Sequence, residues 1–200
     1  MKVVVLGAGI VGASAAYHLA LKGAEVIIVD KKHEGQATAA GAGIVCPWLS
    51  RVDDPDWYNM SKASALYYPS LVSQLEEDGE TELGYAVVGG LGISKAVDEL
   101  KQIEQRVTER KKDTPEVGEI TYLAPGEPQK LFPPLDPAYG AIHVTGAARV
   151  DGRLLRESLL NAAQKHGAVY LQEEAELVTV DGKVTGIKAK SETIAADRVI

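Results

Sequence analysis

A glycine-rich turn between two apolar runs constrains this chain more than any other feature. Residues 2–6 (KVVVL) are mostly β-branched, which predicts a buried strand. Residues 10–22 are rich in alanine and predict a helix that Gly23 ends. Residues 25–30 (EVIIVD) predict a second strand. Strand, turn, helix and strand within about thirty residues make a βαβ unit with parallel strands and a right-handed crossover.

The turn has the pattern G-x-G-x-x-G and lies where a strand ends and a helix begins. Gly7 permits the tight turn, Gly9 leaves room for a diphosphate, and Gly12 lets the helix and strand pack closely. The start of a helix offers N–H groups and a partial positive charge to an anion. Asp30 ends the second strand, where its carboxylate can accept hydrogen bonds from a ribose diol and would repel a 2′-phosphate. Glycines that serve only the turn are the alternative, but the complete unit favours dinucleotide binding.

The composition limits the classes of function. The net charge is −7 and the basic residues do not cluster, which argues against a nucleic-acid partner. Cys46 is the one cysteine, so an intrachain disulfide and a multi-cysteine metal site are excluded, and we expect no metal. The N-terminal run could be a secretion signal, but its glycines weaken a helix and His18 interrupts it. We therefore expect a cytoplasmic protein without a transmembrane segment.

The rest of the chain gives mostly local signals. Residues 55–79 predict a helix in which Pro69 would cause a kink or a break. Ser94 is a candidate N-cap for the next helix, and Asp151 is a candidate N-cap for a helix that ends near residue 166. Asp-Gly at residues 181–182 predicts a hairpin. The last four residues look like the start of a strand, so we expect a fragment of a longer protein.

A second loop of small residues helps to choose between NAD and FAD, because both cofactors use the βαβ unit. Residues 34–44 (EGQATAAGAGI) follow Asp30 closely. Small side chains there allow the backbone to lie against a flat ring or a second face of the diphosphate. A nicotinamide-binding fold would normally continue directly into another helix and strand. The loop therefore favours FAD, with an NAD-dependent dehydrogenase as the alternative.

Two segments carry a resemblance to a known family. GAGIVGASAAYHLALKGAEVIIVD followed by GQATAAGAGIVCPW, and HVTGAARVDGRLLRESLLNAAQKHGA followed by ETIAADRVI, resemble the D-amino-acid oxidase family of flavoproteins. This family includes glycine oxidase, sarcosine oxidase and D-amino-acid dehydrogenase. The resemblance spans nearly the whole chain and is strongest at residues 3–48 and 140–200.

The resemblance implies an α/β fold with FAD as cofactor. It implies a Rossmann-like FAD/NAD(P)-binding domain, of the glutathione-reductase-like flavoprotein type, formed by residues 1–45 and 145–200 and truncated at residue 200. Residues 46–144 would form part of an inserted α+β substrate domain.

The resemblance also assigns the cofactor contacts residue by residue. The diphosphate would contact Gly7, Gly9, Ile10 and Gly12, and the adenosine ribose would contact Asp30 and the Lys31 backbone. Other diphosphate, ribityl and ring contacts would come from Ala37, Thr38, Gly43 and Ile44, and the adenine would meet the Leu177 backbone. The arginine and tyrosine that commonly hold the substrate carboxylate lie beyond residue 200 in relatives, so the catalytic residues stay unknown.

The implied reaction is oxidation of the amine of an amino acid or N-methyl amino acid. Hydride passes from the carbon that bears nitrogen to flavin N5, and water hydrolyses the resulting imine. The sequence leaves open the particular amine, the electron acceptor and the oligomeric state. A truncated, non-catalytic fragment that binds no cofactor is a further alternative. Cys46 is interpreted as an inert thiol and His143 as a structural residue.

Overall fold

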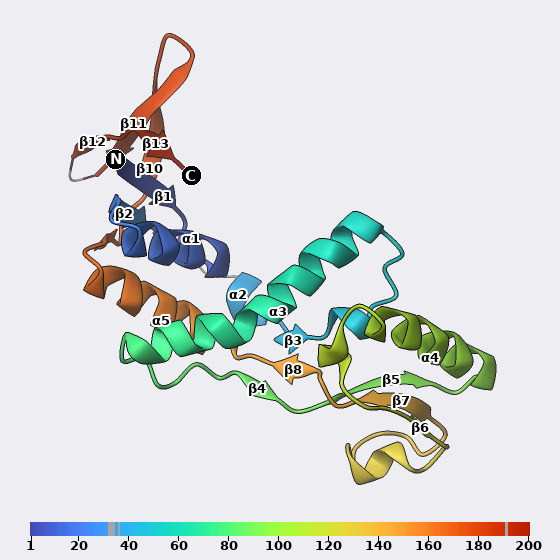
Figure 1. The fold of residues 1–200 in the computed structure, drawn as a ribbon. Helices are drawn as coiled ribbons and strands as arrows, with labels where there is room; N and C mark the ends of the chain where they lie inside the picture. Colours follow the sequence, from blue (N-terminus) through green and yellow to red (C-terminus); the bar gives the residue numbers. More distant parts are fainter. Residues whose placement is uncertain (32–34, 36, 191) are drawn as a thin grey trace. The chain divides into compact units, whose positions relative to one another are not determined.

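The computed structural model describes residues 1–31, 35, 37–190 and 192–200 (Figure 1). The chain divides into two compact units. The first unit contains Met1–Ala42, Val72–Gly84 and Asp151–Ile200, and the second contains Gly43–Leu71 and Tyr85–Val150. The flavin domain and inserted substrate domain expected from the sequence stay predictions.

A four-stranded parallel sheet forms the centre of the first unit. Its strands are β1 (Lys2–Leu6), β2 (Glu25–Val29), β9 (Val169–Leu171) and β13 (Arg198–Val199), in the order β13-β1-β2-β9. The parallel pairing of β1 with β2 confirms the predicted βαβ unit. β13 pairs with β1 on the other side, so the last residues do form a strand.

Two helices pack together beside this sheet. α1 (Ile10–Leu21) packs on β1 and β2, and α5 (Gly152–Lys165) packs on α1. The predicted stop at Gly23 is confirmed, because Gly23 has a φ of 79°. The predicted N-cap of α5 is also confirmed, since the Asp151 carboxylate accepts two backbone N–H groups of the first turn.

An antiparallel sheet covers the other face of β1 and β2. Its strands are β10 (Ala175–Val180), β11 (Lys183–Ala189) and β12 (Thr193–Ala195), in that order. Ile187 of β11 and Ile194 of β12 pack in one cluster with three side chains of the parallel sheet: Val4, Ile27 and Val29. The parallel strands are therefore buried on both faces, which explains their continuous apolar sequence.

The hairpin between β10 and β11 turns at the predicted place. Asp181 and Gly182 have φ values of 49° and 75°, which fit a two-residue type I′ turn. Asp181 is the one non-glycine residue with positive φ among the described residues.

The second unit contains two three-stranded antiparallel sheets. One has the order β5-β7-β6, with β5 (Gly90–Ser94), β6 (Ile120–Leu123) and β7 (Gly140–Val144). The other has the order β3-β8-β4, with short strands β3 (Ile44–Val45), β4 (Ala86–Val87) and β8 (Ala148–Arg149). The 3₁₀ turns of the second unit are η1 (Pro47–Leu49), η2 (Pro115–Val117) and η3 (Pro128–Lys130).

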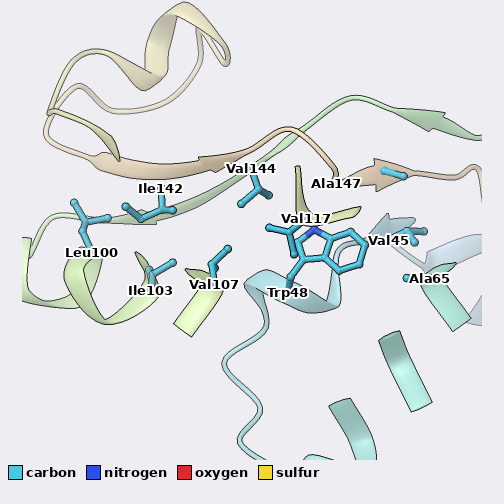
Figure 2. Packing of buried hydrophobic residues seen from close by; sticks show 11 residues of the cluster. Val45, Trp48, Ala65, Leu100, Ile103, Val107, Val117, Ile142, Val144 and Ala147 are labelled. Atoms are coloured by element: carbon cyan, nitrogen blue, oxygen red, sulfur yellow. The ribbon is translucent and has the colours of Figure 1, made fainter. Parts of the chain in front are cut away.

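Helix α4 (Val97–Lys111) supplies one side of the core of the second unit. Figure 2 shows its Leu100, Ile103 and Val107 facing Ile142 and Val144 of β7. Alternation along β7 places Ile142 and Val144 on the same face of the strand. The Trp48 ring extends this cluster of buried side chains.

The predicted N-cap of α4 is wrong. The capping position is Ala96, and the structure records no side-chain hydrogen bond at this cap. Ser94 lies two residues earlier, where its Oγ accepts the Ala96 N–H (3.0 Å) and donates to Glu99 (2.6 Å). Val97, the first residue of α4, is exposed.

Helix α3 (Pro55–Glu77) belongs to both units and runs through Pro69 without interruption. The predicted break is therefore wrong, and the kink given as its alternative stays a prediction. A proline inside a helix costs about 3 kcal/mol. Ala65 and Leu75 are buried on either side of Pro69, and this packing offsets the cost.

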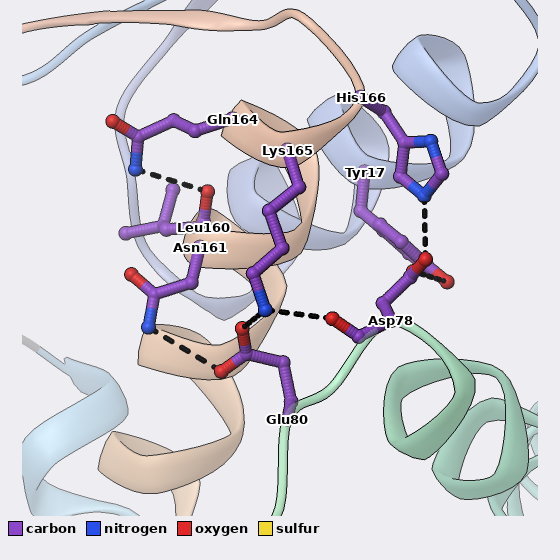
Figure 3. Close-up of polar contacts among 8 residues, drawn as sticks. All are labelled: Tyr17, Asp78, Glu80, Leu160, Asn161, Gln164, Lys165 and His166. Atoms are coloured by element: carbon purple, nitrogen blue, oxygen red, sulfur yellow. Dashed lines mark hydrogen bonds and ion pairs between the residues drawn. The ribbon is translucent and has the colours of Figure 1, made fainter.

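Polar contacts tie the end of α3 to α1 and α5 (Figure 3). The Asp78 carboxylate accepts the Tyr17 hydroxyl at 2.8 Å and lies 2.7 Å from His166 Nε2. Lys165 Nζ donates to the Asp78 carbonyl at 2.6 Å and to Glu80 at 2.7 Å. Tyr17 is fully buried, so its hydroxyl needs this partner.

Candidate functional site

The glycine-rich turn is held closely against α1. Gly7 has a φ of 100°, and its N–H donates to the Val29 carbonyl at 2.8 Å. A Cβ added to Gly12 would lie 1.9 Å from the Gly7 carbonyl oxygen. Gly7 is therefore needed for the backbone conformation and Gly12 for close packing.

Gly9 differs from both of these glycines. It is exposed and has a φ of −67°, which other residues can adopt. A Cβ there would meet only Thr38 Oγ1, at 3.6 Å. Gly9 is the N-cap of α1, and the structure records no side-chain hydrogen bond at this cap. The helix start at Gly9 is therefore uncrowded on its exposed side.

Asp30 follows the last residue of β2 and supports the glycine-rich turn. Its Oδ2 accepts the Ala8 N–H at 2.6 Å. A carboxylate that accepts a backbone N–H makes a stronger hydrogen bond than a neutral acceptor. The sequence predicted a ribose contact for Asp30 but gave no indication of this second role.

A cavity of about 260 Å³ lies beside the turn, at the carboxyl ends of β1 and β2. Three of the predicted cofactor contacts line this cavity: Gly7, Asp30 and Lys31. Glu174 and Ala175 also line it. Lys31 Nζ lies 2.6 Å from Glu174 Oε1, and this hydrogen bond lowers the pKa of the Glu174 carboxyl. Ligands of open α/β sheets bind at the carboxyl ends of the strands.

Two further predicted contacts lie in the short helix α2 (Ala37–Ala40). Thr38 Oγ1 accepts the N–H of Ile10, the first residue of α1, at 3.0 Å. Ala37 is exposed at the start of α2. Glu34 and Gln36, at the start of the predicted small-residue loop, lie outside the described residues.

The remaining predicted contacts lie elsewhere. Gly43 and Ile44 belong to the second unit, where a Cβ on Gly43 would lie 1.9 Å from the Val150 carbonyl oxygen. Ile44 is 77% exposed. Leu177 is 54% exposed within β10 and is not among the residues that line the 260 Å³ cavity. Ala175, two residues earlier, does line it.

Sequence reasoning missed one side chain that supports the turn. Arg156 Nε donates to the Ala8 carbonyl oxygen, across 148 residues of sequence. Arg156 lies in the second turn of α5, next to α1. A single arginine on a helix gives no local signal of such a distant contact.

The interpretation of Cys46 as an inert thiol agrees with its surroundings. Burial raises the pKa of the thiol to about 11, so the reactive thiolate is scarce at neutral pH. The described residues contain no group of three or more His, Cys, Asp or Glu side chains that could hold a metal ion. No helix in the described part of the chain has the length and apolar character needed to cross a membrane.

Comparison with known proteins identifies the family. The family model described as FAD dependent oxidoreductase (DAO) matches residues 2–200, so the chain belongs to this family of flavoproteins. This confirms the resemblance found in the sequence. It also decides between the two cofactors that the glycine motif left open, because FAD is the cofactor of the family.

Individual relatives agree with this assignment. The uncharacterized oxidoreductase YurR of Bacillus subtilis is 49% identical over 98% of this chain and 53% of that protein. Glycine oxidase of Pseudomonas putida is 27% identical over 100% of this chain and 54% of that protein. The crystal structure of iminodiacetate oxidase from Chelativorans sp. BNC1 matches with a TM-score of 0.92 and 47% identity. That match covers 98% of this chain and 53% of the solved chain.

The chain therefore spans about half the length of the relatives it matches. The predicted Rossmann-like α/β class is confirmed by the parallel sheet and by this structural similarity. The inserted substrate domain and the residue-by-residue cofactor contacts stay predictions.

Proposed function

We propose that the first unit binds FAD, with the diphosphate at the start of α1 and the adenosine ribose at Asp30. The observation that carries this proposal is the uncrowded start of α1 at Gly9, next to the cavity that Asp30 lines. The N–H groups and positive dipole of a helix start attract a diphosphate. Ala175 is a better candidate than Leu177 for the adenine contact, because Ala175 lines this cavity.

The residues present fit a dinucleotide. A Cβ at Gly9 would meet only Thr38 Oγ1, at 3.6 Å, so glycine leaves open space at the helix start where we place the diphosphate. The carboxylate of Asp30 suits a ribose diol and disfavours a 2′-phosphate. Lys31 and Glu174 form an ion pair and both line the cavity.

We propose further that the whole enzyme oxidises the amine of an amino acid or N-methyl amino acid to an imine. Support comes from relatives whose names specify iminodiacetate and glycine, both of which carry an amine next to a carboxylate-bearing carbon. FAD, when bound, supplies the hydride acceptor. The residues of this chain bind and orient the cofactor, and Thr38 and Asp30 hold the turn that presents it.

Titration of the purified chain with FAD and, separately, with NAD⁺ tests the cofactor proposal. We expect quenching of flavin fluorescence with FAD and no heat of binding with NAD⁺ in calorimetry. Binding of NAD⁺ in place of FAD, or of neither, would overturn the proposal. A Gly9→Val variant is the matched test of the assigned diphosphate position, because it should lose FAD affinity while the chain stays folded.

The substrate proposal requires the full-length enzyme. Anaerobic mixing with iminodiacetate, glycine or sarcosine should bleach the flavin absorbance if the amine donates hydride. Retention of the oxidised spectrum with all three amines would contradict the proposed substrate class. Admission of oxygen, followed by a peroxide assay, then separates an oxidase from a dehydrogenase.

We propose the cytoplasm as the place of action, and a small-molecule amino acid or amine as the substrate, with a separate electron acceptor that reoxidises the flavin. The single, half-buried cysteine suits a reducing compartment. Fractionation of cells that produce the full-length protein tests this location.

A further inference from the structure

The peptide groups of the glycine-rich turn are fixed from two sides. Ala8 is fully buried, and its N–H donates to Asp30 Oδ2 at 2.6 Å. Its carbonyl oxygen accepts Arg156 Nε from α5. We propose that Arg156 is a positioning residue for the diphosphate of FAD, because it fixes the direction of the Gly9 N–H. This inference rests on the proposed function.

The Ala8 carbonyl and the Gly9 N–H belong to one planar peptide group. In a trans peptide, these two bonds point in opposite directions, and the described residues contain no cis peptide. A guanidinium that holds the Ala8 carbonyl toward α5 therefore aims the Gly9 N–H away from α5. Gly9 is exposed and a Cβ there would meet only Thr38 Oγ1, so a diphosphate can approach this residue.

Asp30 acts on the preceding peptide group by the same geometry. When Asp30 holds the Ala8 N–H, the Gly7 carbonyl must point the opposite way. The Gly7 carbonyl oxygen is the atom closest to the position of a Cβ on Gly12. Asp30 thus sets the peptide that packs on α1, whereas Arg156 sets the peptide that faces the diphosphate.

Arg156 also interacts with a second group, the hydroxyl of Tyr170. Tyr170 of β9 lies close to both side chains: burial raises the pKa of its hydroxyl, the charge of Asp30 raises it further, and Arg156 lowers it. Asp30 and Arg156 therefore both interact with Tyr170. Arginine offers several donors from one planar group, so it can hold the Ala8 carbonyl and the Tyr170 hydroxyl together.

The test measures FAD and ADP affinity of the chain with Arg156→Met, which keeps the length of the side chain and removes its donors. We expect about tenfold weaker binding of both ligands, because one aligned N–H of the cradle is lost. Arg156→Lys should restore part of the affinity, since its ammonium can still donate to the Ala8 carbonyl. Arg153→Met is the matched control, because Arg153 is exposed on the same helix.

A second control separates positioning from general stability. Asp78→Ala removes the contacts of Tyr17 and His166 at the far ends of α1 and α5, so it should lower the melting temperature and leave FAD affinity unchanged. Equal loss of FAD affinity in Asp78→Ala and Arg156→Met would overturn the inference. Unchanged affinity in Arg156→Met would also overturn it. A wild-type chain that binds neither FAD nor ADP would instead overturn the proposed function.

Discussion

Replacement of Gly12 by alanine tests the packing of α1 on the glycine-rich turn. The new Cβ would lie 1.9 Å from the Gly7 carbonyl oxygen and 3.3 Å from Val5 Cγ1. Carbon and oxygen repel strongly below about 3 Å, so the helix and turn must separate by more than about 1 Å. Neither side yields easily, because Asp30 holds the turn and Val5 is buried.

Two opposing effects set the sign of the change. Alanine is a better helix former than glycine, which would stabilise the helix by up to about 1 kcal/mol. Overpacking of a tight contact costs about 1–3 kcal/mol, and a clash of backbone with Cβ belongs at the upper end. We therefore expect Gly12→Ala to lower the free energy of unfolding by about 2 kcal/mol. In a chain of this size, the melting temperature should fall by about 4–8 °C.

The assay must report on the first unit. Trp48 and Trp57 both lie in the second unit, so tryptophan fluorescence would not follow this transition. Hydrogen exchange of the β1 amides, together with far-UV circular dichroism, reports on the parallel sheet. Gly9→Ser is the matched control, and it should be at least as stable as wild type, because serine caps a helix start at least as well as glycine. A Gly12→Ala chain as stable as the Gly9→Ser chain would refute the packing argument.

Three other perturbations have expected outcomes. Arg110→Ala removes a guanidinium that donates to the backbone carbonyls of residues 47, 48 and 50. Urea unfolding should show that the free energy of unfolding falls by about 2 kcal/mol. Lys111→Ala, at an exposed position of the same helix, should leave the free energy of unfolding unchanged. Asp151→Ala removes the N-cap of α5 and should cost about 1 kcal/mol, seen as a melting temperature lower by about 2–4 °C. The folded pKa of Cys46 is raised to about 11, so its contribution to stability is complete below the unfolded value and is lost as the pH rises through about 11. The stability difference between wild type and Cys46→Ala should be constant up to about pH 8 and decline as the pH rises from there to about 11, and a decline that begins below about pH 7 would contradict this.

Local signals in the sequence predicted the local structure well. The cap at Asp151, the stop at Gly23 and the turn at residues 181–182 depend on atoms within a few residues of each position. Such features follow from backbone conformation and short-range hydrogen bonds, which the neighbouring sequence determines. Ser94 shows the limit of this reasoning, because a good capping residue lay two positions before the actual cap.

Contacts between distant segments could not be predicted in the same way. Ala8 meets Asp30 and Arg156, which are 22 and 148 residues away in the sequence. The continuity of α3 through Pro69 likewise depends on burial on both sides of the proline. These features arise only when the packed structure brings the partners together, and one sequence carries no record of that proximity.

The glycines of the predicted site fall into three physical situations, and at Gly9 neither the backbone conformation nor packing within the described residues requires a glycine. Gly7 needs its positive φ, while Gly12 and Gly43 each approach a carbonyl oxygen so closely that a Cβ would lie 1.9 Å from it. Gly9 has an ordinary φ and a clear position for a Cβ. Serine, threonine or aspartate would cap α1 better than glycine does. Thr38 Oγ1 already accepts the Ile10 N–H, and glycine at the cap leaves open space beside this contact, which is where we propose the diphosphate of FAD.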